Sequence, residues 1–200
     1  QYADRTAFIQ MDVKMSFAEL DRQSRAFAAW LQQVAGLDKG KRVAIMLLNT
    51  LQYPVALFGA LRAGCTVVNT NPLYTPRELE HQLNDSGAEV VVILENFAHV
   101  LEEVLERTPV RHVIVTSIGE MLGFPKAQIV DYVVRHKRKA VPAWNIPSAV
   151  RFKDVLKAGR ALTLTDVPLT HADLAFLQYT GGTTGVSKGA MLSHGNMVSN

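Results

Sequence analysis

Residues 43–48 read VAIMLL, an apolar run with no polar position. A strand that is apolar on both faces is typical of a parallel sheet buried between two layers of helices. Further runs with strand character follow at residues 66–68, 89–94 and 110–116. The run at residues 43–48 therefore predicts the centre of a mainly parallel sheet with helices on both faces.

Helical signals separate these strands, and such alternation favours an α/β fold. Residues 16–34 carry apolar side chains at helical spacing and open with the S-x-x-E pattern of a capping box at Ser16. Thr75 opens a second helix with the T-x-x-E form of the box, and Gly87 ends it. Further helices are predicted at residues 51–63 and at residues 97–107.

Residues 117–168 show a less regular pattern, because four prolines divide them. These prolines are Pro125, Pro142, Pro147 and Pro168. We predict that this irregular segment wraps around the outside of the core. The chain is then expected to return as a strand at residues 174–179 and to begin another helix at residues 193–196.

The composition is that of an ordinary globular chain, with 48% hydrophobic residues, 20% charged residues and a net charge of +3. The longest apolar runs fall far below the roughly 20 residues that span a bilayer, so neither a transmembrane anchor nor a signal peptide is expected. The net charge is too small to indicate a nucleic-acid partner. The single cysteine, Cys65, is expected to be a small buried residue in a reducing cytoplasm.

The strongest chemical signal is YTGGTTGVSKGA at residues 179–190, directly after an apolar strand. Its glycines let backbone N–H groups turn toward an anion, its threonines add hydroxyl donors, and Lys188 adds a positive charge. The order of glycine and lysine matches neither the Walker A loop nor the dinucleotide-binding fingerprint. A polyphosphate loop of another kind is predicted. A plain glycine-rich hairpin with an exposed lysine is the alternative, but it would not require the interleaved threonines.

This segment resembles the signature Y-T-S-G-T-T-G-x-P-K-G of the acyl-adenylate-forming enzymes, which include acyl-CoA synthetases, luciferases and the adenylation domains of peptide synthetases. It departs from the signature at Gly181, in place of serine, and at Ser187, in place of proline. These changes remove one hydroxyl donor and one fixed φ angle. The glycine form of the loop, with LNTLQYP at residues 48–54, NTNPLYTP at residues 69–76 and AMLSHGN at residues 190–196, makes nearly the whole chain similar to bacterial long-chain fatty-acyl-CoA synthetases.

The resemblance implies both a fold and a reaction. Residues 1–200 would form part of the large N-terminal AMP-binding domain of the acyl-adenylate-forming fold, and the small C-terminal domain would lie beyond Asn200. The implied reaction joins a long-chain fatty acid to ATP as an acyl-adenylate and then passes the acyl group to the thiol of coenzyme A. ATP, Mg²⁺ and coenzyme A are the implied cofactors and co-substrates, and this piece alone is expected to be inactive.

The resemblance also assigns the loop to the phosphates of ATP. The candidate residues are Tyr179, Thr180, Gly181, Gly182, Thr183, Thr184, Gly185, Val186, Ser187, Lys188, Gly189 and Ala190. Lys188 would neutralise phosphate charge and Thr184 would donate a hydroxyl, so these two are the catalytic candidates. No metal ligand is expected in residues 1–200, because the family's magnesium ligand would lie further along and the six histidines are scattered.

Two alternatives follow from the limits of a short loop motif. Another acyl-adenylating enzyme, specific for an aryl acid or an amino acid, would carry the same loop. A non-catalytic module would bind ATP without turnover. Exchange of pyrophosphate into ATP that depends on a cognate acid distinguishes them, because a binding module catalyses no exchange.

A basic run, RHKRK at residues 135–139, follows an apolar helical face. The apolar face consists of Ile129, Val130, Val133 and Val134, and the cations are Arg135, Lys137, Arg138 and Lys139. Such a helix end is suited to bind the anionic inner face of a membrane. The plainer alternative is a helix C-terminus whose cations are solvated. The run lacks the interleaved aromatic residues that stack bases, so no nucleic-acid partner is expected.

Overall fold

The computed structural model describes residues 2–180 and 187–199. The strands are β1 (Thr6–Gln10), β2 (Val13–Ser16), β3 (Arg42–Met46), β4 (Thr66–Asn69), β5 (Val90–Leu94), β6 (His112–Thr116), β7 (Val150–Arg151), β8 (Leu174–Thr180) and β9 (Lys188–Ser193). The α-helices are α1 (Phe17–Gln33), α2 (Gln52–Arg62), α3 (Pro76–Ser86), α4 (Ala98–Val104), α5 (Lys126–Tyr132), α6 (Phe152–Gly159) and α7 (His194–Ser199). Two 3₁₀ turns, η1 (Glu95–Phe97) and η2 (Leu105–Arg107), flank α4, and a π-helical turn, η3 (Val133–Lys137), extends α5. None of the helices in the described ranges is long and apolar enough to cross a membrane.

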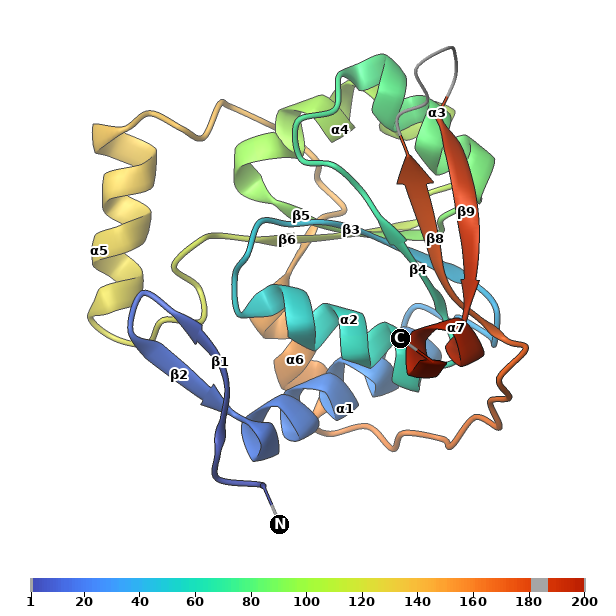
Figure 1. Cartoon of the computed structure of the whole chain (residues 1–200). Coiled ribbons are helices and arrows are strands. Elements are labelled where there is room, and N and C mark those ends of the chain that lie inside the picture. The colour runs from blue at the N-terminus through green and yellow to red at the C-terminus, as the bar shows by residue number, and fades with distance from the viewer. Residues whose placement is uncertain (1, 181–186, 200) are drawn as a thin grey trace.

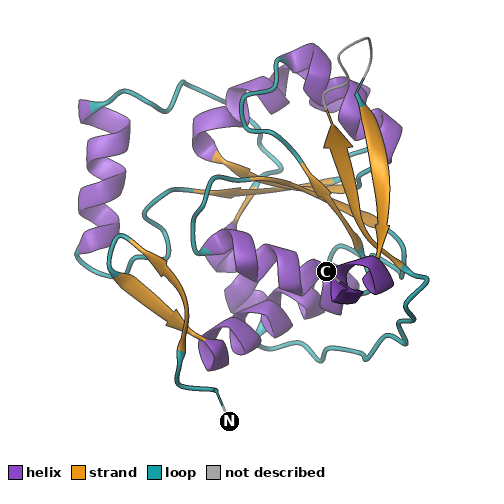
Figure 2. Cartoon of the chain, viewed as in Figure 1, coloured by secondary structure: helices purple, strands orange, loops and turns teal. Residues whose placement is uncertain are grey.

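A sheet in the order β7-β6-β5-β3-β4-β8-β9 forms the middle layer of the described chain, and β1 pairs with β2 in a separate hairpin. The strands from β3 to β8 pair in parallel, and only the edge strand β9 is antiparallel to its neighbour among these described strands. Val43 and Ile45 face α1, α2 and α6, whereas Ala44 and Met46 face α3 and α4. Helices therefore cover both faces (Figure 1; Figure 2), and the predicted α/β fold is confirmed.

The elements predicted outside residues 117–168 are present. The predicted strands correspond to β3, β4, β5, β6 and β8, and the predicted helices correspond to α1, α2, α3, α4 and α7. Their bounds differ by a few residues; β3, for example, ends at Met46 although the apolar run continues to Leu48. The helix predicted at residues 97–107 is divided, because 3₁₀ turns stand at both ends of α4.

Capping interactions explain where α1 and α3 begin. The Glu78 N–H donates to Thr75 Oγ1 at 3.4 Å and the Thr75 N–H donates to Glu78 Oε2 at 2.8 Å, which completes the predicted capping box. Gly87 ends α3 with a left-handed φ of 62°. At α1 only half of the predicted box forms: the Glu19 N–H donates to Ser16 Oγ at 3.2 Å, while the Glu19 carboxylate bonds further along the helix.

The segment at residues 117–168 differs from the irregular, peripheral path that the prolines favoured. It contains α5, the edge strand β7 and α6, and α6 packs against α1. Phe152, Val155 and Leu156 are buried because their spacing gives α6 an apolar face toward the core. The expectation of a wholly peripheral segment is therefore wrong, since the prolines lie between these short elements and leave them intact.

Cys65 lies beside β4, fully buried in the apolar cluster that α1, α2 and α6 share with the sheet. Burial raises the pKa of its thiol to about 12, and the carboxylates of Glu89 and Asp38 add to the shift. The thiol therefore stays neutral and unreactive at neutral pH. The predicted role of Cys65 as a small buried residue is confirmed.

Candidate functional site

The predicted phosphate loop joins β8 to β9, which pair as an antiparallel hairpin. Tyr179 lies opposite Gly189, and Thr180 lies opposite Lys188. The predicted residues Gly181, Gly182, Thr183, Thr184, Gly185 and Val186 lie outside the described residues. The structure therefore places the two ends of the predicted loop, at residues 179–180 and 187–190.

The loop ends lie at the carboxyl edge of the parallel sheet. β8 runs parallel to β4, which runs parallel to β3, so all three strands end on the same side. Open α/β sheets bind their ligands outside the carboxyl ends of the strands. The side chains of Thr180 and Lys188 are exposed there, where an anion can reach them.

Tyr179 anchors the first end of the loop to α3. Its hydroxyl donates a hydrogen bond to Asp85 Oδ2 at 2.5 Å, and its ring is buried. Burial raises the pKa of the Tyr179 hydroxyl, and the Asp85 carboxylate raises it further, so the phenol stays protonated and keeps donating. A Cβ atom at Gly189 would lie 3.0 Å from the Tyr179 ring, so glycine gives the ring its space on the opposite strand.

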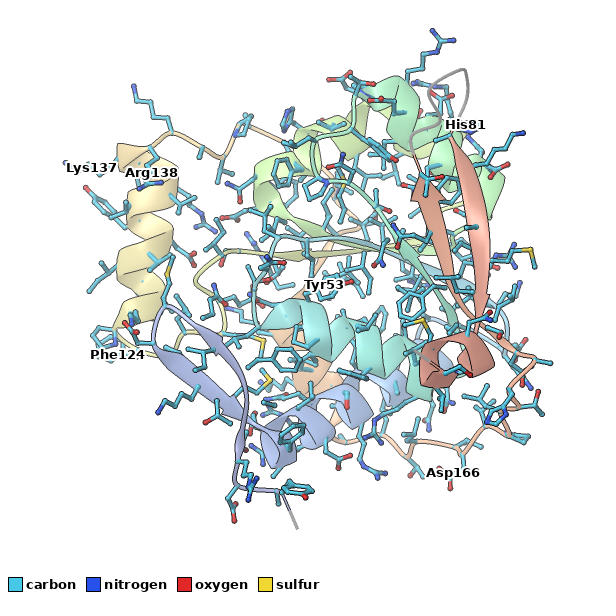
Figure 3. All side chains as sticks on the ribbon, viewed as in Figure 1. Tyr53, His81, Phe124, Lys137, Arg138 and Asp166 are labelled. Carbon is cyan, nitrogen blue, oxygen red and sulfur yellow. The ribbon has the colours of Figure 1, made fainter. Side chains whose placement is uncertain are left out.

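The same helix contacts the second end of the loop. His81 Nε2 lies 3.3 Å from the Ser187 carbonyl oxygen, to which it donates in the tautomer that carries the proton on this nitrogen. His81 and Asp85 are four residues apart and therefore share one face of α3. Figure 3 shows His81 beside the ends of β8 and β9. Neither residue belongs to a motif, so no sequence pattern indicated that one helix holds both ends of the loop.

A polar cavity of about 260 Å³ lies next to the loop, at the carboxyl ends of β3, β4 and β8. Among the residues that line it are Asn49, Tyr53, Asn69, Asn71, Tyr74 and Gln178. The Tyr53 hydroxyl donates to Asn69 Oδ1 at 2.9 Å, and Asn69 Nδ2 donates to Gln178 Oε1 at 3.0 Å. Burial raises the pKa of the Tyr53 hydroxyl, which favours the donating form. The fold thus brings residues 48–54 and 69–76 together beside the loop, in a cavity suited to neutral polar groups.

The residues present at the loop ends suit an anion and not a metal ion. Within residues 2–180 and 187–199, no group of three or more His, Cys, Asp and Glu side chains could hold a metal. The exposed groups at the loop ends are a hydroxyl, from Thr180, and an ammonium, from Lys188. An ammonium repels a cation, and one hydroxyl oxygen falls short of the several oxygen ligands that Mg²⁺ takes. The described part of the chain therefore does not fit a magnesium site.

Glu120 lines two other cavities. One, of about 300 Å³, lies between α6 and the β1-β2 hairpin, and the other, of about 440 Å³, lies beside α5. Burial raises the pKa of the Glu120 carboxyl, although hydrogen bonds, including one from the Lys153 N–H at 2.6 Å, partly offset the effect. The ionised carboxylate is therefore less favourable in the folded chain than in the unfolded chain.

Glu120→Gln is expected to raise the melting temperature of the full-length protein at about pH 7.5 and to change it little at about pH 4. The pKa of Glu120 is raised above its ordinary value of 4.5, so stability is lost as the pH rises through the folded-state pKa. Glutamine removes this loss and its amide oxygen still accepts from Lys153. Differential scanning fluorimetry at both pH values measures the effect, and a lower melting temperature at the higher pH would contradict it.

Comparisons with known proteins identify relatives over the whole chain. A family model described as AMP-binding enzyme matches residues 1–200. The chain is 56% identical over 200 residues to the long-chain-fatty-acid–CoA ligase of Salmonella typhimurium, a match that covers 100% of this chain and 36% of that protein. The chain therefore spans about a third of the length of the curated relatives it matches.

Solved structures share the fold. The structure of Mycobacterium smegmatis MbtA superposes with a TM-score of 0.76 at 28% identity, over 98% of this chain and 32% of that one. A long-chain-fatty-acid-CoA ligase, FadD1, from Archaeoglobus fulgidus superposes with a TM-score of 0.69 at 27% identity, over 98% of this chain and 33% of that one. The sheet that carries the ends of the loop thus belongs to a fold already seen in longer proteins.

Proposed function

The chain belongs to the AMP-binding enzyme family, and we propose that its full-length protein activates a long-chain fatty acid with ATP and transfers the acyl group to coenzyme A. The observation that carries this proposal is the 56% identity across all 200 residues to a long-chain-fatty-acid–CoA ligase. We assign residues 1–200 to a large N-terminal AMP-binding domain, with a small C-terminal domain in the remainder of the protein.

In the proposed reaction, a carboxylate oxygen of the fatty acid attacks the α-phosphorus of ATP and pyrophosphate leaves. The sulfur of coenzyme A then attacks the acyl carbonyl, and AMP leaves as the thioester forms. Negative charge grows on the pyrophosphate in the first step, so oriented donors and a nearby cation lower the barrier. We assign residues 179–190 to the ATP phosphates, with Lys188 as the cation and Thr184 as a hydroxyl donor.

Mg²⁺ belongs to the proposal as the counter-ion of ATP, because this ion commonly binds proteins through substrate phosphates. The contribution of the chain itself is the exposed Lys188 ammonium and Thr180 hydroxyl at the carboxyl edge of the sheet. The anchors behind them, Tyr179 with Asp85 and Ser187 with His81, hold the two ends of the loop against α3. These anchors hold Thr180 and Lys188 in position before ATP arrives, which reduces the cost of ordering these two donors on binding.

The test is exchange of labelled pyrophosphate into Mg-ATP by the full-length protein, with octanoate, palmitate and oleate as acids and with benzoate and phenylalanine beside them. Exchange that depends on the long acids would support the proposal. Exchange only with benzoate or only with phenylalanine would show that the substrate is an aryl acid or an amino acid and not a fatty acid. ATP binding without exchange under any acid would indicate a non-catalytic module.

Tyr179→Phe is expected to raise the KM for ATP about tenfold in the same assay, because a hydrogen bond to a charged group contributes at least about 1.5 kcal/mol. The substitution removes the hydroxyl that Asp85 accepts and keeps the buried ring in place. Asp85→Asn should act in the same direction, since the hydroxyl then loses a charged acceptor. The measurement is the initial rate of exchange as a function of ATP concentration at a saturating concentration of acid.

The matched control is Tyr2→Phe, which removes the hydroxyl of an exposed tyrosine near the start of the chain. This variant should keep the KM of the wild type. An unchanged KM in Tyr179→Phe and in Asp85→Asn would show that the link to α3 does not position the loop. A lower melting temperature with an unchanged KM would assign the pair to stability alone.

We place this activity in the cytoplasm, with peripheral contact to the inner face of the membrane as the finer part of the proposal. Of the cations predicted to make that contact, Arg135 has another partner, because its guanidinium donates to both carboxylate oxygens of Glu95 at 2.8 and 2.7 Å. Lys137, Arg138 and Lys139 are the exposed candidates. Within the basic run, Arg135 therefore pairs with Glu95, and the other three cations remain available on the surface.

A further inference from the structure

The helix formed by α5 and η3 turns two charged side chains, Asp131 and Arg135, toward the protein. Asp131 Oδ2 accepts from Ser117 Oγ at 2.7 Å, and Asp131 Oδ1 accepts from the Gly119 N–H at 2.8 Å. One turn later, Arg135 donates to both carboxylate oxygens of Glu95. The inner face of this helix is therefore held to the ends of β5 and β6 by polar contacts.

Glu95 fixes this orientation because its side chain is only 3% exposed. Arg151 of β7 also donates to it, at 3.1 Å, so the buried carboxylate lies between two guanidinium groups. Breaking a buried, paired charge is strongly unfavourable, since the charge left behind is no longer compensated. Rotation of the helix to bury its opposite face would break these pairs. The polar face is thus the fixed inner face.

The exposed side of this helix carries several large apolar side chains. Phe124, just before α5, is 88% exposed, and Ile129, Tyr132 and Val133 are 59%, 56% and 36% exposed. A surface helix normally has the reverse pattern, with its apolar stripe toward the core. Exposed apolar residues that gather on one surface mark interaction sites. We call Phe124, Ile129, Tyr132 and Val133 the α5 outer face.

Three cations extend the α5 outer face at its C-terminal end. Lys137, Arg138 and Lys139 are exposed, and none of them forms an ion pair with any residue that the structure describes. Figure 3 shows Lys137 and Arg138 at the end of the helix opposite Phe124, and α5 stands at the side of the molecule, away from the sheet. Apolar and cationic groups are therefore continuous along one exposed helix.

We propose that the α5 outer face docks on the surface of a membrane that contains anionic lipids. The apolar side chains enter the boundary between headgroups and acyl chains, and the three cations contact lipid phosphates. The alternative to a membrane is another segment of the protein that covers the α5 outer face. The three cations favour the membrane, because an apolar cover would leave Lys137, Arg138 and Lys139 without anionic partners. The inference deepens the proposed membrane contact and rests on the proposed function for its purpose, since fatty acids partition into membranes.

The experiment is co-sedimentation of the full-length protein with vesicles of phosphatidylcholine alone and with vesicles of equal parts phosphatidylcholine and phosphatidylglycerol. An apolar-face variant carries Ile129→Ser, Tyr132→Ser and Val133→Ser. A charge variant carries Lys137→Gln, Arg138→Gln and Lys139→Gln. The wild type is expected to sediment with the anionic vesicles, and each variant is expected to show about a tenfold lower partition coefficient, because docking uses both signals.

The matched control carries Lys14→Gln, Arg77→Gln and Lys157→Gln, which remove the same charge from exposed positions on other elements. It should sediment like the wild type. Failure of the wild type to bind anionic vesicles, or equal binding by the apolar-face variant, would overturn the proposal. A changed oligomeric state or a lower melting temperature in the apolar-face variant, without any change in sedimentation, would overturn it in favour of a second copy or another part of the chain as the cover.

Pyrophosphate exchange with octanoate, which is soluble, separates this inference from the proposed function. All variants should keep the wild-type rate of exchange, because α5 lies away from β8 and β9, which carry the ends of the loop (Figure 1). A wild-type protein that binds vesicles and catalyses no exchange would contradict the proposed reaction and leave the docking surface supported. A wild-type protein that catalyses exchange and does not bind vesicles would support the proposed reaction and contradict the docking surface.

Discussion

Replacement of Lys188 by alanine in the full-length protein is expected to lower the rate of fatty-acid-dependent pyrophosphate exchange by about 100-fold to 1000-fold, the usual effect of removing one group that stabilises charge in a transition state. Lys188 begins β9 directly opposite Thr180, with its side chain exposed at the carboxyl edge of the sheet. Its ammonium is assigned to the charge that grows on the leaving pyrophosphate. Because the side chain contributes little to the core, the melting temperature should not change.

The control for Lys188→Ala is Lys157→Ala, which removes an exposed lysine from α6. Exchange by this control should equal that of the wild type. Lys188→Arg keeps the charge on a differently shaped group, so partial activity there would separate the charge of Lys188 from its precise position. An unchanged rate of exchange in Lys188→Ala would refute the assignment of the loop to the ATP phosphates, whichever acid the protein activates.

The strands of the sheet could be predicted from the sequence because burial on both faces leaves a direct signature. The runs at residues 43–48 and 89–94 became β3 and β5, whose positions are buried almost throughout. The start of α3 could also be predicted from the sequence, because the side chains of Thr75 and Glu78 each accept a hydrogen bond from the other residue's backbone N–H. Signals of this kind are local, because the residues that carry them are also the ones that make the contacts.

Contacts between distant segments left no such signature. α3 reaches both ends of the loop through His81 and Asp85, whose partners, Ser187 and Tyr179, lie about a hundred positions further along the chain. Such partners meet only because β4, which precedes α3, pairs with β8 in the sheet. The order of strands in a sheet is a property of the whole chain, so the sequence alone could not identify these anchors.

The apolar spacing around α5 correctly predicted a helix, but it did not predict which side of that helix faces the protein. Ile129, Val130, Val133 and Val134 were predicted to share one face, but Val130 and Val134 are half-buried, whereas Ile129 and Val133 are exposed. Asp131 belongs to the half-buried side because Ser117 and Gly119 supply its hydrogen bonds. The partners of polar residues therefore set the rotation of this helix, and apolar spacing alone could not.

Gly159→Ala is expected to lower the free energy of unfolding by about 3 kcal/mol, at the upper end of the cost of overpacking a core. Gly159 is where α6 meets α1, and a Cβ atom there would lie 1.9 Å from the Ala26 carbonyl oxygen. The obstacle is backbone, which cannot turn aside as a flexible side chain can. The two helices would have to separate, and the buried Phe152 would lose part of its contact with Phe27, whose ring centroid lies 5.5 Å away.

Helix propensity predicts the opposite sign for Gly159→Ala, because alanine is more favourable than glycine within a helix by up to about 1 kcal/mol. The comparison with Ala158→Gly, at the exposed neighbouring position, isolates the contact. That variant should lose no more than the propensity difference, whereas Gly159→Ala should lose about three times as much despite its better intrinsic propensity. Thermal unfolding of the full-length variants measures both changes. A higher melting temperature for Gly159→Ala would show that α1 and α6 do not approach this closely, and would support the peripheral path that the prolines of residues 117–168 indicated.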